Sequence, residues 1–132
     1  SQYRETFVQA VTQLNDFALA YVHILEPRPD SGHSMATIDY LTPLLREHYR
    51  GTLLLNGGYD RDKGIQAIES GLGDAVAYGF PFIANPDLVD RLWEGAPLAD
   101  ADAETLYSEG REGYSDYPAL TTSGRAEARS EV

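Results

Sequence analysis

The chain has 132 residues, which fits one domain, and 42% of them are hydrophobic. Its formal net charge of −11 at pH 7 argues against nucleic-acid binding, which needs a basic face. With no cysteine, there is no disulfide and no thiolate metal site. No apolar run reaches membrane-span length and no signal-peptide pattern is present, so we expect a cytoplasmic protein. The acidic, lysine-poor composition fits either a salt-rich cytosol or a biased genome.

The first half of the chain predicts a helix, a strand and a second helix. Residues 18–25 read as a buried strand, which the following prolines end. A helix follows up to Tyr49, with Thr37 as a candidate N-cap and Pro43 favouring a start nearer Leu41. Before the strand, apolar residues at helical spacing predict an amphipathic helix: Tyr3, Phe7, Ala10, Val11, Leu14 and Phe17.

The middle of the chain predicts two further strand–helix pairs. Residues 51–56 form an apolar strand, and the helix after it runs from Arg61 to Ser70 and ends before Gly71. This helix is expected to bury Ile65, Ile68 and Leu72. Residues 74–78 form the next strand, and a helix then begins at Asn85 as N-cap, with Pro86 at its first position. The alternation of strands and helices predicts an α/β fold with a parallel sheet.

Glycines follow two of these predicted strands. Gly57 and Gly58 stand between a strand and a helix N-terminus, and Gly79 follows the next strand. Glycine lets backbone amides approach an anion closely, and a helix N-terminus adds partial positive charge. The pattern is typical of a phosphate site, but the residues alone favour a plain turn that needs glycine for a positive φ.

Four sequence runs resemble the C-terminal part of the old yellow enzyme family, the FMN-dependent NAD(P)H:flavin oxidoreductases and ene-reductases. They occur in the family's order and reach nearly to Leu120: 21–28 (YVHILEPR), 56–59 (NGGY), 78–92 (YGFPFIANPDLVDRL) and 112–118 (EGYSDYP). The resemblance implies a partial (β/α)8 TIM barrel: the last three βα units over residues 1–95 and a C-terminal segment over 96–120 that folds back on the barrel. Residues 121–132 are expected to be a disordered tail.

The resemblance also implies a cofactor and its contacts. Gly57, Gly58 and Gly79 would hold the FMN phosphate, as glycine-rich loops at the last two barrel strands commonly do. Phe80 stands where the family has an arginine that pairs with this phosphate, and Arg61 is a candidate substitute. Tyr107 would line the substrate side, or else be a surface-packing aromatic. Tyr114 and Tyr117 would anchor the C-terminal segment.

The residues that carry the family's chemistry lie on strands upstream of those matched here. No catalytic residue is therefore assigned in this chain, and the three histidines make no metal motif. Glu26 and Arg28 follow a strand and could face a barrel mouth, but we interpret them as a structural ion pair. The implied function is FMN binding within an enzyme that uses NAD(P)H to reduce enone-type substrates. The alternatives are a non-catalytic barrel remnant and one half of a split flavoenzyme that needs a partner chain or self-association.

Overall fold

The computed structural model describes residues 2–27, 40–107 and 109–120, and the chain divides into two compact units. The N-terminal unit is Ser1–Ala77 and the C-terminal unit is Tyr78–Val132. Three predicted features lie outside the described residues: the N-cap Thr37, the ion-pair residue Arg28 and the tail at 121–132. Within the described residues, no helix is long and apolar enough to cross a membrane.

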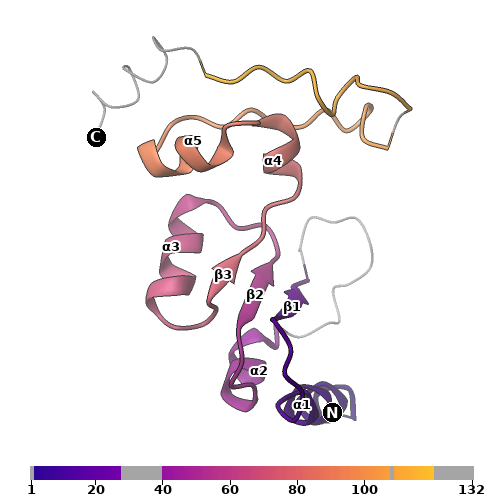
Figure 1. Cartoon of the computed structure of the whole chain (residues 1–132), viewed down its shortest axis with the longest axis vertical. Coiled ribbons are helices and arrows are strands. Elements are labelled where there is room, and N and C mark those ends of the chain that lie inside the picture. The colour runs from indigo at the N-terminus through magenta and orange to yellow at the C-terminus, as the bar shows by residue number, and fades with distance from the viewer. Residues whose placement is uncertain (1, 28–39, 108, 121–132) are drawn as a thin grey trace. The chain divides into compact units, whose positions relative to one another are not determined.

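The N-terminal unit alternates helices and strands, as the sequence predicts (Figure 1). Its three strands are all parallel, in the order β1-β2-β3, with Val22 opposite Leu53 and Leu54 opposite Ala75. All three strands are shorter than predicted: residues 18–21 precede β1, residues 51–52 precede β2, and β3 has only two residues. The elements are α1 (Gln2–Leu14), β1 (Val22–Leu25), α2 (Thr42–His48), β2 (Leu53–Asn56), α3 (Arg61–Glu69) and β3 (Ala75–Val76).

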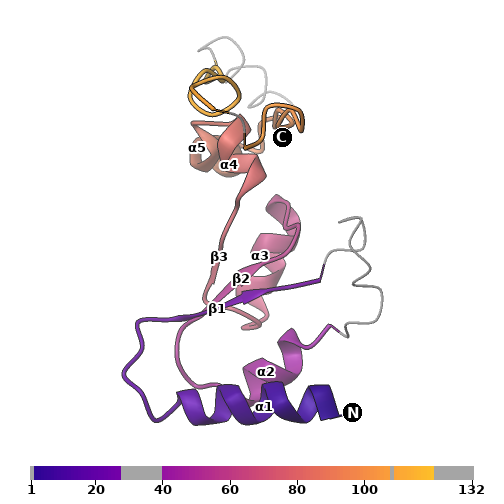
Figure 2. The ribbon, with the colours of Figure 1, turned by 90° about the vertical axis from the view of Figure 1, so that its right-hand side faces the viewer.

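The core of this unit forms where α1 and α2 lie side by side near the central strand (Figure 1, Figure 2). Leu53 and Leu55 of β2 are fully buried, and their burial contributes the apolar stabilisation of the unit. Helix α2 begins after Leu41, as Pro43 in its first turn predicts. The buried residues of this core are Val11, Leu41, Leu45, Tyr49, Leu53, Leu55 and Ala67.

Helix α3 has the predicted boundaries but buries a different face. Asp60 caps its first turn by accepting a hydrogen bond from the Lys63 N–H at 2.8 Å, and Gly71 takes φ +73 after its end. Its buried residues are Gly64 and Ala67, whereas Ile65 and Ile68 are each 42% exposed. The predicted burial of the two isoleucines is therefore wrong, because the face of the helix that carries Gly64 and Ala67 is the one turned to the core.

In the C-terminal unit, the predicted helix is present but begins later, and a short helix that was not predicted precedes it. The short helix is α4 (Phe80–Ala84) and the predicted one is α5 (Leu88–Glu94), and α5 ends at Gly95 with φ 69, as predicted. The prediction that Asn85 is the N-cap is wrong: Asn85 follows α4, and the N-cap of α5 is Asp87. The buried Asn85 amide donates to the Pro81 and Ala99 carbonyls, and its Oδ1 accepts from the Ala99 N–H.

A buried ion pair ties the C-terminal segment to α5. The Arg91 Nε lies 2.8 Å from Asp87 Oδ1, and the two side chains are only 6% and 8% exposed. The Arg91 guanidinium also donates to the Pro97 and Pro118 carbonyls, while Asp87 Oδ2 accepts from the Leu120 N–H. Burial opposes ionisation of Asp87, but these hydrogen bonds outweigh it and lower the pKa of the carboxyl.

Candidate functional site

The turn between β2 and α3 contains both glycines of the first predicted phosphate contact. Gly58 is exposed and has φ 74, so this position does need the conformational freedom of glycine. Gly57 is required for space instead: a Cβ there would lie 2.5 Å from the Glu26 Cβ and 2.9 Å from Glu26 Oε2. Gly58 therefore agrees with the interpretation as a plain turn that needs a positive φ. Gly57 instead lies too close to the Glu26 side chain to carry a Cβ.

The first turn of α3 adds polar groups beside this glycine pair. A hydrogen bond from the Lys63 N–H lowers the pKa of Asp60, so the cap is ionised at neutral pH. The Arg61 guanidinium is 3.4 Å from Asp62 in an exposed pair. The exposed glycine turn and the N-terminus of α3 offer partial positive charge to an anion, whereas the Asp60 and Asp62 carboxylates oppose one.

Glu26 contacts the same turn from the end of β1, which sequence reasoning missed. Its side chain is buried, and Oε1 accepts hydrogen bonds from the Thr42 hydroxyl at 2.5 Å and the Tyr59 hydroxyl at 3.0 Å. Its partners in the described residues are thus hydroxyls, while Arg28, the expected ion-pair partner, lies outside them.

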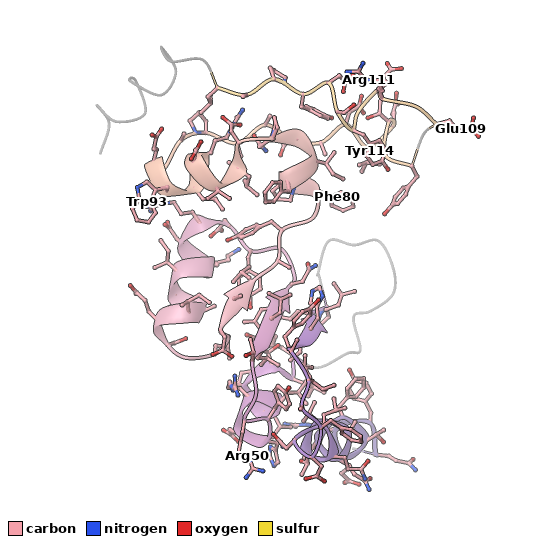
Figure 3. The ribbon with its side chains drawn as sticks, viewed as in Figure 1. Arg50, Phe80, Trp93, Glu109, Arg111 and Tyr114 are labelled. Atoms are coloured by element: carbon pink, nitrogen blue, oxygen red, sulfur yellow. The ribbon has the colours of Figure 1, made fainter. Side chains whose placement is uncertain are left out.

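Gly79 and Phe80 lie at the start of α4, where Figure 3 labels Phe80. Gly79 has φ −94, and no atom lies within 4 Å of where a Cβ would be, so neither conformation nor crowding requires glycine here. This open space suits the approach of a ligand to the backbone. Phe80 is 41% exposed. Both residues belong to the C-terminal unit, and Gly57 and Gly58 belong to the N-terminal unit.

Tyr107 stands out in the C-terminal segment by its backbone and its exposure. It has φ 66, the only positive φ of a non-glycine residue in the described chain, and its side chain is 86% exposed. Its N–H donates to the Tyr114 hydroxyl at 2.7 Å, and the Asp102 N–H donates to the Tyr117 hydroxyl at 2.8 Å. Tyr114 and Tyr117 therefore anchor this segment, as expected, because their hydroxyls accept hydrogen bonds from its backbone. The Tyr107 ring, in contrast, is largely exposed to solvent.

An open hollow of about 290 Å³ lies in the same segment. Its lining includes the acidic residues Asp102, Glu112 and Asp116, whose charges oppose an anionic ligand. Among the described residues, no group of three histidine, aspartate or glutamate side chains is placed to hold a metal ion. The glycine turn after β2 remains the candidate for a phosphate, because it combines a positive-φ glycine with a helix N-terminus.

The sequence of this chain matches known flavoproteins. The model of the NADH:flavin oxidoreductase / NADH oxidase family matches residues 3–99. The chain is 39% identical over 111 residues to 12-oxophytodienoate reductase 2 of Arabidopsis thaliana, with 83% of the chain and 30% of that protein covered. It is 42% identical over 111 residues to 12-oxophytodienoate reductase 7 of Oryza sativa subsp. japonica, where the shares are 77% and 28%. The chain thus spans less than a third of either relative.

The structure resembles solved enzymes of the same kind. The old yellow enzyme from Trypanosoma cruzi matches with a TM-score of 0.83 and 33% identity, over 92% of this chain and 31% of that one. Morphinone reductase in complex with tetrahydroNAD matches with a TM-score of 0.76 and 33% identity, over 91% and 31%. These enzymes are TIM barrels, and a three-stranded parallel sheet is consistent with part of one. The chain therefore belongs to the NADH:flavin oxidoreductase / NADH oxidase family, the old yellow enzyme family, whose cofactor is FMN.

Proposed function

We propose that this chain is the FMN-phosphate-binding portion of an NAD(P)H-dependent ene-reductase. In this proposal, residues 1–95 are the last three βα units of the barrel, and 96–120 fold back over it. Three parallel strands in sequence order support this assignment, because consecutive barrel strands are neighbours.

The observation that carries the proposal is the turn after β2. It places an exposed glycine with positive φ between the carboxyl end of a parallel strand and a capped helix N-terminus. Ligands of barrel enzymes bind at this end of the strands, and phosphates bind at the final ones. In a family whose cofactor is FMN, the phosphate of FMN is the group that fits.

The reaction of the whole enzyme would be hydride transfer from NAD(P)H to FMN and then to an activated alkene. The flavin supplies this chemistry, and the protein supplies binding and orientation. Gly57, Gly58 and Gly79 would hold the phosphate, and no catalytic residue is assigned to this chain. Tyr107 would flank the substrate, a role that its exposed ring supports. The nicotinamide analogue bound to morphinone reductase supports NAD(P)H as the reductant.

Titration of the purified chain tests the phosphate site directly. FMN, riboflavin and inorganic phosphate would be added separately, and the backbone amides of Gly57 and Gly58 followed by NMR. We expect FMN and inorganic phosphate to shift these two amides, and riboflavin to leave them in place. Shifts of equal size with riboflavin, or none with saturating phosphate, would contradict the proposal.

Two other functions have specific support. Phe80 removes the arginine that the resemblance leads us to expect, which favours a non-catalytic barrel remnant that binds no flavin. A split enzyme, assembled with a partner chain or by self-association, is favoured by the exposed apolar residues around β1, where Tyr21 is 55% and Leu25 72% exposed. A yellow purified protein would argue against the remnant. Flavin absorbance that appears only after mixing with a chain carrying the upstream strands would identify the split enzyme.

A further inference from the structure

Glu26 is a buried carboxylate that the proposed phosphate contacts do not use. It is 7% exposed, directly after β1, and its Oε1 accepts hydrogen bonds from two hydroxyls that are far apart in sequence. Thr42 begins α2, and Tyr59 ends the glycine turn. A buried carboxylate is costly unless donors satisfy it, and these two hydroxyls are such donors.

The backbone and side chain of Glu26 contact the glycine turn on both sides of Gly57 and Gly58. The Glu26 N–H donates to the Asn56 carbonyl at 2.7 Å, before the pair, and the carboxylate accepts from Tyr59, after it. Between these contacts Gly57 packs so closely on Glu26 that a Cβ would lie 2.5 Å from the Glu26 Cβ. The turn is thus held at its start, middle and end by one residue.

The tyrosines around this carboxylate remain hydrogen-bond donors over a wide pH range. Burial raises the pKa of Tyr59, and its hydrogen bond to Glu26 raises it further. Burial and the charge of Glu26 also raise the pKa of Tyr40, which is hydrogen-bonded to Tyr59. The Tyr59 hydroxyl therefore keeps its proton at neutral pH and can donate it to Glu26.

We propose that Glu26 is a positioning residue that holds the Gly57–Gly58 turn in the conformation that binds the FMN phosphate. This inference rests on the proposed function. Two adjacent glycines are otherwise free to sample many conformations, and ordering them on binding would weaken affinity. Contacts that fix the turn beforehand remove this cost, without any contact between Glu26 and the ligand.

The inference is tested in the full chain with Tyr59→Phe, which removes one hydrogen bond and keeps the ring. We expect its dissociation constant for FMN to rise by about tenfold, the effect of losing one hydrogen bond to a charged group. The dissociation constant for riboflavin should stay the same, because riboflavin has no phosphate. Glu26→Gln, with an amide in place of one carboxylate oxygen, should shift the FMN constant in the same direction.

Tyr49→Phe is the matched control, because Tyr49 is buried in the same unit, but its hydroxyl lies beside Gly51 instead of the glycine turn. It should leave the preference for FMN over riboflavin unchanged, whatever it does to the melting temperature. If the wild-type chain prefers FMN and Tyr59→Phe keeps that preference, the inference is wrong and the proposed function stands. If the wild-type chain shows no phosphate-dependent binding, both are overturned. If Glu26→Gln does not fold, the FMN and riboflavin dissociation constants of Tyr59→Phe alone test the inference.

Discussion

At the scale of single residues, Gly57 and Gly79, which are both predicted to contact the phosphate, differ in how well they tolerate an added methyl group. At Gly57 an added methyl group would meet the Glu26 Cβ at 2.5 Å, whereas at Gly79 it would meet nothing within 4 Å. We expect Gly57→Ala to lower the free energy of unfolding by about 1–3 kcal/mol, the usual cost of overpacking. Gly79→Ala is the control and should be close to neutral. Equal denaturation midpoints for the two variants would contradict this prediction.

Phe80 permits a gain-of-affinity experiment. Its side chain is 41% exposed at the first position of α4, so an arginine there loses little packing. If residue 80 faces the phosphate, Phe80→Arg should strengthen FMN binding by about 1.5–3 kcal/mol, or ten- to a hundredfold. The gain should shrink at high salt, because the new contact is electrostatic. Riboflavin should gain little, and equal gains for both flavins would mean that residue 80 does not face the phosphate.

The sequence identified the residues of the glycine turn but not what holds them. Gly57 and Gly58 are visible as a pair between a strand and a helix, because local pattern alone marks them. Glu26, Thr42 and Tyr59 meet only because the parallel register places the end of β1 beside the end of β2. No spacing rule relates residues 16 and 33 positions apart, so this hydrogen-bonded cluster could not be predicted without the fold.

At the scale of elements, hydrophobicity alone misassigned the buried face of α3. Ile65 and Ile68 are the most apolar residues of the helix, yet Gly64 and Ala67 face the core. The order of strands and helices was predictable, because periodicity, caps and glycines agree along the first 77 residues. In the C-terminal unit, Asn85 and Pro86 mimic a helix start, but the Asn85 side chain instead joins α4 to Ala99.

The buried ion pair between Asp87 and Arg91 on α5 predicts how stability depends on pH. Asp87→Asn leaves Arg91 buried without its charged partner, which should cost about 3 kcal/mol, the lower part of the usual range, because Arg91 keeps two carbonyl partners. The folded-state pKa of Asp87 is lowered, so its contribution is fully present above the unfolded value of about 4 and is lost as the pH falls through the folded value.

Melting curves of the wild-type chain and Asp87→Asn between pH 7 and pH 3 measure this contribution. The difference in melting temperature should be largest near neutral pH and should narrow below about pH 4. Asp62→Asn is the control, since the Asp62 side chain is 88% exposed, and it should melt like the wild type throughout. A constant difference across this pH range would contradict the assignment of the effect to the Asp87 charge.

At the scale of the whole molecule, the chain carries a fraction of the family's sequence. It covers 30% of the Arabidopsis reductase and 31% of the Trypanosoma cruzi enzyme. The resemblance implies that the groups that bind substrate and donate the proton lie on upstream strands. We therefore expect the 132-residue chain alone to show no oxidation of NADPH with a simple enone above a flavin-only control. Turnover above that control would refute this prediction.

The open sheet leads to a last prediction, about association in solution. Among the described strands, β1 and β3 each pair on one side only, and Leu19, Tyr21 and Leu25 expose apolar side chains in and near β1. Unpaired edges and apolar patches favour contact between chains, and a net charge of −11 opposes this contact only through screened repulsion. We expect a dimer or a larger soluble assembly at tens of micromolar, with the assembled fraction rising as salt screens the charge.

Leu25→Lys, which adds charge to a side chain that is already 72% exposed, should shift the population toward monomer without lowering the melting temperature. Light scattering at two salt concentrations measures both effects, and a monomeric mass with a cooperative melt in each would show that these edges do not pair between chains.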